Sequence, residues 1–321
     1  MTAASVALWT LLAGPRRPAR VLDIDAGAVH LWIEPLAAAQ ARDGRDHPGA
    51  VVALLEPDAV RLPIGIVLPP AASALVPVSV AGSPVSRGEI HIGWGAITLA
   101  EARFSVLDWW NPGIPVLPRP VLSITSASSS APSSAPDAGA DSRAESAGWA
   151  EPLAIGLAAL ASGDAERAVH HLIGVGGGLI PIGDDVLVGA LAALAAWAPD
   201  SPDRAALAQA TAAALSPARP STSVTASAAV RASATSVSAE VPTTPVSAAL
   251  LQSAATGFAT PEVIDYLTAL SLEGRPEGLP VDSPGVDQAR ARLAAIGIGS
   301  GGAIALGIHH QLRALPLGST E

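Results

Sequence analysis

Residues 174–197 read GVGGGLIPIGDDVLVGALAALAAW, which is a glycine-rich turn, two adjacent aspartates and then a run with almost no polar side chain. From residue 186 the run is apolar on every face, as is typical of a helix buried in the middle of a domain. Glycines permit backbone conformations closed to other residues and let a ligand approach the main chain. We therefore predict a central helix that begins beside a flexible turn, with Asp184 and Asp185 at its start.

Helical patterns continue on both sides of this run. Helices are expected over 153–160 and over 165–173, the second with Asp164 as its N-cap. The block 243–315 is also helical, with Thr244 as N-cap and Pro245 at the first helical position.

The first part of the chain has a different pattern. Residues 1 to about 122 alternate apolar and polar side chains in short pieces separated by Pro and Gly. Strands are expected at 21–25, 29–33, 51–55, 65–68, 76–80 and 89–99. A short helix is expected over 100–110, closed by the turn sequence Asn111-Pro112-Gly113.

Two segments rich in Ser, Ala, Thr and Pro offer almost nothing large to bury, so we predict that they are disordered. The fold class is therefore α+β. A β-rich, barrel-like domain (1–122) is followed by a disordered linker (123–150) and by a helical domain (151–321), which has a disordered insertion at about 216–242.

Composition excludes several classes of function. The chain has no cysteine, and all 18 of its basic residues are arginine. The sequence therefore excludes Cys-ligated metals, a Walker A loop and Schiff-base catalysis, because each needs a cysteine or a lysine. A formal charge of -10 argues against nucleic acid as a partner. The apolar run 186–198 is too short to span a membrane and no signal peptide is evident, so we expect a cytoplasmic protein with no membrane anchor.

The aspartate pair has two readings. One carboxylate can simply cap the following helix. Alternatively, Asp184 and Asp185 bind a divalent metal such as magnesium, or one of them acts as a general base while exposed glycine N–H groups receive an anion. The three consecutive glycines, Gly176, Gly177 and Gly178, together with Gly183 are the candidate anion-binding residues of this turn.

Other motifs are less specific. Gly297, Gly299 and Gly302 match G-x-G-x-x-G without a preceding strand, so no dinucleotide site is predicted, and Ser300 either caps its helix or binds an anion. The histidine pairs at 170–171 and 309–310 point in different directions on a helix and are expected on its surface.

Three segments together resemble a known family. They are LAALASGDAERAVHHLIGVGGGLIPIGDDVLVGALAAL (157–194), PTTPVSAALLQSAATG (242–257) and IGIGSGGAIALGI (296–308). In this order they resemble a family long catalogued as a domain of unknown function, whose best-known member is the AllH-type subunit of oxamate carbamoyltransferase. Residues 89–112 resemble the family's strand and turn before its linker.

The resemblance implies a carbamoyltransferase-like subunit of allantoin and purine catabolism. Such a subunit acts with partner subunits, one of them similar to acyl-CoA synthetases, and phosphorolyses oxalurate to oxamate and carbamoyl phosphate. Asp184 and Asp185 are then the catalytic candidates. The substrate- or anion-binding candidates extend to Thr244, Ser247, Gly299, Ser300 and Gly301. Arg87 and Arg275 are candidate partners for the negative charge that develops on oxygen when phosphate attacks the carbamoyl carbon.

The chain also departs from the family pattern. Ile180 and Ile182 stand where the first motif usually has Thr and Ser, and Ile298 and Ala303 stand where the third usually has His and an acidic residue. We therefore expect a divergent member with altered or lost activity. The alternative is a non-catalytic small-anion-binding or assembly protein that retains the scaffold.

Overall fold

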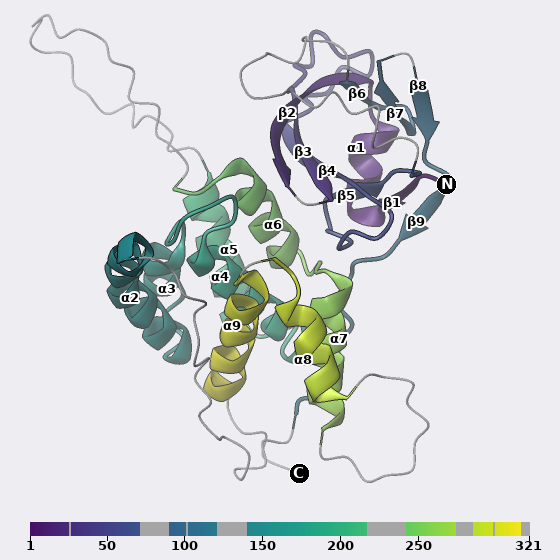
Figure 1. Ribbon diagram of the computed structural model, residues 1–321. Helices are drawn as coiled ribbons and strands as arrows, with labels where there is room; N and C mark the ends of the chain where they lie inside the picture. The colour runs from purple at the N-terminus through teal and green to yellow at the C-terminus, as the bar shows by residue number, and fades with distance from the viewer. Residues whose placement is uncertain are drawn as a thin grey trace, which may run out of the picture.

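A computed structural model describes residues 1–25, 27–70, 90–100, 102–120, 140–216, 242–273, 285–297 and 299–315. All strands of this part of the chain lie before residue 111, and its long helices lie after residue 139 (Figure 1). The α+β class predicted from the sequence is confirmed. None of the helices in the described ranges has the length and apolarity needed to cross a bilayer.

The strands form one curled sheet around the short helix α1 (Trp9–Ala13), as Figure 1 shows. The order across the sheet is β8-β7-β6-β2-β3-β4-β5-β1-β9, with parallel pairing only at β4–β5 and β1–β9. The strands are β1 (Ala3–Ser5), β2 (Arg17–Asp25), β3 (Ala28–Ile33), β4 (Ala50–Leu55), β5 (Gly65–Val67), β6 (Ile90–Gly93), β7 (Ala96–Leu99), β8 (Ala102–Ser105) and β9 (Asp108–Trp110).

The helix predicted over 100–110 is wrong. Residues 102–105 form β8, which pairs antiparallel with β7, and Asp108–Trp110 form β9, which pairs with β1. Local composition favoured a helix, but residues 102–105 form a hairpin with the preceding strand β7, and only β9 depends on a strand distant in sequence, β1. The single strand expected at 89–99 is a hairpin, since Trp94 and Gly95 both have positive φ at the turn between β6 and β7. The strand expected at 76–80 lies outside the described residues.

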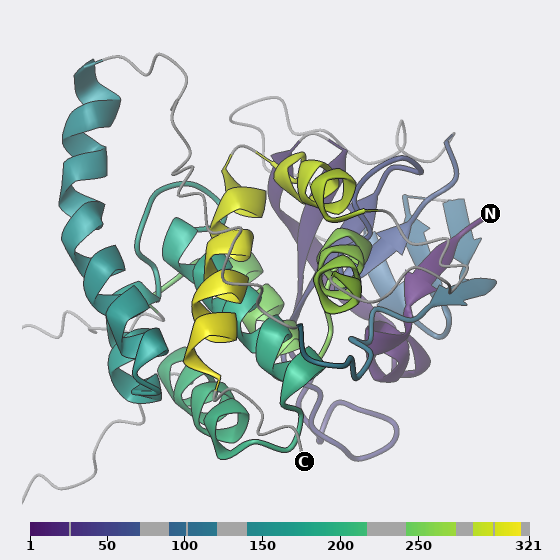
Figure 2. The ribbon, with the colours of Figure 1, turned by 90° about the horizontal axis from the view of Figure 1, so that it is seen from below.

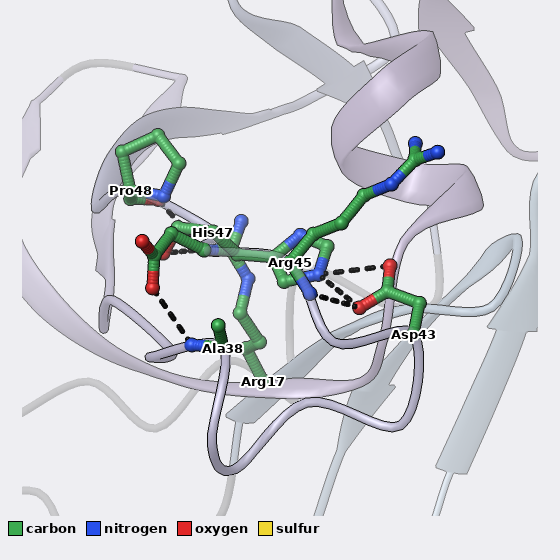
Figure 3. Close-up of polar contacts among 7 residues, drawn as sticks. Arg17, Ala38, Asp43, Arg45, His47 and Pro48 are labelled. Atoms are coloured by element: carbon green, nitrogen blue, oxygen red, sulfur yellow. Dashed lines mark hydrogen bonds and ion pairs between the residues drawn. The ribbon is translucent and has the colours of Figure 1, made fainter.

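A buried arginine fixes the loop between β3 and β4. The guanidinium of Arg17 donates to the backbone carbonyls of Glu34, His47 and Pro48, the last at 2.7 Å (Figure 3). Burial lowers the pKa of Arg17 from its usual value, and the carbonyls replace the water that the charge has lost. The same loop is closed by a contact between His47 and Asp43.

The second half of the described chain packs around one helix, α4 (Ile182–Trp197), as predicted. Almost every residue of α4 is buried. The surrounding helices are α2 (Ala140–Ala161), α3 (Ala165–Leu172), α5 (Pro202–Leu215), α6 (Pro245–Ala255), α7 (Pro261–Leu272), α8 (Val286–Ala294) and α9 (Ser300–Ala314) (Figure 2). Asp164 and Thr244 cap α3 and α6 as expected, through bonds from Arg167 and Ser247 N–H.

Helix α2 begins within the segment 123–150, for which we predicted a disordered linker. Its start at Ala140 places eleven residues of that segment in a helix. The alanine-rich composition lacks large apolar groups, but alanine also has the highest intrinsic helix propensity. Residues 121–139 and 217–241, and so most of both predicted disordered segments, lie outside the described residues.

Sheet and helices share one apolar interface. In β4 both faces are buried: Val52 and Leu54 point into the curl of the sheet, whereas Val51, Ala53 and Leu55 point toward the helices. The latter cluster contains Val246 of α6 and Leu179 of the glycine-rich turn. The outer face of the sheet therefore supports the two segments on which the candidate site is built.

Helices α4 and α9 approach so closely that only glycine fits at the contact. A Cβ at Gly189 would lie 2.0 Å from the carbonyl oxygen of Ile304, and a Cβ at Gly307 would lie 2.0 Å from that of Val186. Both contacts are with backbone, which cannot rotate away as a side chain can. Gly189 and Gly307 are thus packing positions.

Replacing Gly307 by alanine should destabilise the protein by about 1–3 kcal/mol, because the added methyl group forces the two helix backbones apart. The matched control is Gly302→Ala in the same helix, where the position is exposed and no atom lies within 4 Å of the new Cβ. We expect that control to be neutral or to stabilise by up to about 1 kcal/mol. Urea denaturation of both variants measures the difference, and equal midpoints would contradict the packing role.

Candidate active site

The glycine-rich turn between α3 and α4 has the backbone that its sequence predicts. Gly174, Gly176 and Gly178 have φ of 72°, 114° and 90°, a region that disfavours other residues. At Gly174 a Cβ would lie 1.9 Å from the carbonyl oxygen of Pro242, so the turn lies directly against the start of the second motif.

Asp184 connects these two segments. Its side chain is fully buried, and Oδ1 accepts a hydrogen bond of 2.7 Å from the N–H of Gly174. Oδ2 accepts one of 2.5 Å from the Ser247 hydroxyl and another from the Thr243 hydroxyl. The carboxylate therefore binds donors from the preceding turn and from the start of α6.

The capping interpretation of the pair is wrong for this structure. Helix α4 has Pro181 at its N-cap and no side-chain cap, and the three donors to Asp184 come from outside α4. The Asp184 carboxylate does not bond to the N–H groups of its own helix, because the tertiary structure places three other donors within reach.

Asp185 occupies a different environment although it is the next residue. It is 4% exposed, and burial raises its pKa to about 7; the Ser300 hydroxyl opposes this shift by hydrogen bonding, and the charge of Asp184 adds to it. Burial also raises the pKa of Asp184, against the lowering effect of Ser247, Thr243 and Gly174. Asp185 is thus poised to exchange a proton near neutral pH.

Contacts with Ser300 and Thr244 complete the assembly of the three motifs. Ser300 is the first residue of α9 and follows Gly299, which has a φ of 90°. In the second motif, Thr244 accepts from the N–H of Ser247 at 3.1 Å and donates to the carbonyl of Leu179 at 2.6 Å. Residues as far apart in sequence as Asp185 and Ser300 therefore meet at the start of α4.

The predicted glycines divide into two groups. Gly183 and Gly301 are buried, and a Cβ there would lie 2.0 Å from the Leu172 carbonyl oxygen and 1.8 Å from that of Leu293. These two serve close packing rather than access to a ligand. Gly177 and Gly178 are exposed, and within the described chain no hydrogen bond uses the N–H groups of Gly176, Gly177 or Gly178.

Several sequence predictions need correction, and some concern residues outside the described part of the chain. Thr243, which donates to Asp184, was missed, although it directly precedes the recognisable N-cap Thr244. His309 is not a simple surface residue, since its Nε2 lies 2.7 Å from the hydroxyl of the buried Tyr266. Arg87, Arg275 and Ile298 lie outside the described residues.

The magnesium hypothesis fits these residues poorly. Both oxygens of Asp184 already accept hydrogen bonds, and the carboxylate of Asp185 has the Ser300 hydroxyl as its partner. Across the described ranges, no three His, Asp or Glu side chains are grouped as a metal would require. Magnesium usually needs more oxygen ligands than this centre supplies.

Comparison with known proteins supports the resemblance seen in the sequence. Residues 172–312 match the family model described as "Oxamate carbamoyltransferase subunit AllH". Over this stretch, the chain is similar to the AllH family. The match includes all three motifs and ends within α9. No curated protein and no solved structure matches the chain.

The pKa of Asp185 predicts a pH-dependent stability. Because the pKa in the folded state, about 7, lies above the reference value of 3.8, the folded protein binds the proton more tightly than the unfolded chain does. The contribution of Asp185 is therefore complete below pH 3.8 and is lost as the pH rises to about 7. Relative to Asp185→Asn, wild-type stability should fall by up to about 1.4 kcal/mol per pH unit across this window.

Denaturation of both proteins from pH 4 to pH 8 tests this expectation. Asp184 is present in both, so its own titration largely cancels in the difference. A difference in unfolding free energy that does not change with pH would show that Asp185 titrates normally.

The donor set also predicts the response to metal. We expect millimolar magnesium to leave the melting temperature of the protein unchanged, because Asp184 has no free oxygen to offer. A melting temperature that rises with magnesium, and no longer rises in Asp185→Asn, would establish a metal site by mass action.

Proposed function

We propose that this chain is a subunit of an oxamate carbamoyltransferase-type enzyme, which acts with partner subunits on oxalurate and phosphate. The observation that carries the proposal is the different bonding of two adjacent buried carboxylates. Asp184 is immobilised by three donors, whereas Asp185 has a pKa of about 7 and a hydroxyl partner. The match of residues 172–312 to the AllH family model supports the choice of reaction.

The chemistry suits these groups. Phosphate attacks the carbamoyl carbon of oxalurate, the bond from that carbon to the internal nitrogen breaks, and oxamate leaves while carbamoyl phosphate forms. The proton lost by hydrogen phosphate must reach the departing nitrogen. A carboxyl group with a pKa near the working pH is suited to move such a proton.

We assign the roles accordingly. Asp185 accepts and returns the proton through the hydroxyl of Ser300, which is less buried than the carboxyl. The N–H groups of Gly176, Gly177 and Gly178 bind anionic oxygens, as unpaired backbone donors in a glycine turn do. Asp184, Thr243, Thr244 and Ser247 hold the turn in position.

The departures from the family pattern support the second candidate, a binding or assembly protein without catalysis. Ile182 packs against the turn, since its Cγ2 lies 2.9 Å from the place of a Cβ at Gly176. An apolar group occupies that position where the family usually provides a hydroxyl. This candidate retains anion binding by the glycine N–H groups but predicts no turnover.

Reconstitution with the partner subunits distinguishes the two candidates. We expect carbamoyl phosphate to form from oxalurate only when phosphate is present. Asp185→Asn should lower kcat at least about 100-fold, the usual size of a general acid–base contribution. Asp200→Asn, an exposed aspartate in the turn after α4, is the matched control and should retain full activity. Phosphate binding without turnover in the complete assembly would favour the binding protein.

A further inference from the structure

An aromatic side chain lies against the glycine-rich turn. A Cβ at Gly177 would lie 3.6 Å from Cη2 and 3.7 Å from Cζ2 of Trp149, so the edge of the indole ring lies beside this exposed glycine. Trp149 comes from α2, which packs along α3 and also contacts α9. Figure 2 shows α2 at the edge of the helical region, with its first turns projecting beyond the other helices.

The next glycine is open. Gly178 is exposed, has a φ of 90°, and no atom lies within 4 Å of the place of its Cβ. The indole lies beside this part of the turn, and no described hydrogen bond uses the N–H groups of Gly176, Gly177 and Gly178. Trp149 is itself half-buried, which leaves part of the ring accessible.

The other tryptophan of the described helical region has a structural role. Trp197 is buried in the core, and its Nε1 donates to Ser271 at 2.8 Å. No hydrogen bond to a described residue uses the indole N–H of Trp149, and its ring lies beside Gly177 of the turn. A large aromatic ring left half-exposed at a glycine turn is a common way to build one wall of a small-molecule site.

The backbone N–H groups of the turn and the indole ring together favour a particular shape of ligand. Backbone N–H groups bind any anion, whether it is a planar carboxylate or a tetrahedral phosphate. The indole face adds attraction only for a flat group, such as the conjugated amide of a carboxylate–amide. Ile180 and Ile182, which replace hydroxyl donors, leave the site more dependent on the ring and the main chain.

We infer that Trp149 is a specificity-determining residue, which holds the planar carboxylate–amide substrate against the glycine-rich turn. The inference rests on the proposed function, because it uses the same anion site. It adds a residue outside the family match, which begins at residue 172. The ring orients the amide plane while the N–H groups hold the charged end.

Ligand binding by the full chain tests this role with oxamate as the planar probe and inorganic phosphate as the tetrahedral one. Trp149→Leu should weaken oxamate binding about three- to tenfold and leave phosphate binding unchanged. Trp149→Phe keeps a flat ring and should restore most of the oxamate affinity. Trp94→Phe, an exposed tryptophan in the N-terminal region, is the control and should bind both probes normally.

Tryptophan fluorescence provides a second measurement, which is made on the folded protein. Oxamate should change the tryptophan emission of the wild-type protein and shield it from acrylamide, and both effects should disappear in Trp149→Phe but not in Trp94→Phe. Oxamate that binds the Leu variant as tightly as the wild type would overturn the inference alone. Failure of both probes to bind any variant would instead count against the anion site, and so against the proposed function.

Discussion

The buried carboxylate of Asp184 holds the centre of the helical region together. A charge without access to water is tolerated only if hydrogen bonds replace its hydration, and here three donors do so. Those donors belong to the glycine-rich turn and to the start of α6. A single desolvated group therefore fixes the relative position of two segments that are about 60 residues apart in the chain. Once they are fixed, Thr244 can reach the carbonyl of Leu179.

Close helix packing places the third motif beside the first. Gly189 and Gly307 let α4 and α9 approach at backbone distance, and this contact brings Ser300 to Asp185. The same packing excludes water from Asp185, which is why its pKa rises. Glycine thus has two separate roles in these motifs. In the helices it allows two backbones to approach closely, and in the turn its N–H groups are not used by any described hydrogen bond. Burial separates the two roles, since Gly183 and Gly301 belong to the first and Gly178 to the second.

The substitutions relative to the family pattern leave the hydrogen bonds of the two carboxylates in place. Ile180, Ile182 and Ala303 depart from the pattern expected from the resemblance, while Asp184, Asp185, Ser247 and Ser300 keep the connections described above. The framework that orients the turn is therefore retained although its polar lining is reduced. An aromatic wall at Trp149 is one physical means by which such a site could keep its selectivity for a flat ligand.

The sequence by itself determined the elements whose cause is local. The apolar run after residue 186 predicted the central helix, Asp164 and Thr244 predicted helix starts, and alternation predicted most strands, because each pattern depends on neighbours in the chain. The three motifs also showed the resemblance to the AllH family, whose model matches residues 172–312. Only the tertiary structure decided which way the Asp184 carboxylate turns, since its donors lie 10, 59 and 63 residues away. It likewise placed residues 102–110 in edge strands and not in the predicted helix: β8 forms a hairpin with the preceding strand β7, and β9 pairs with β1 at the start of the chain.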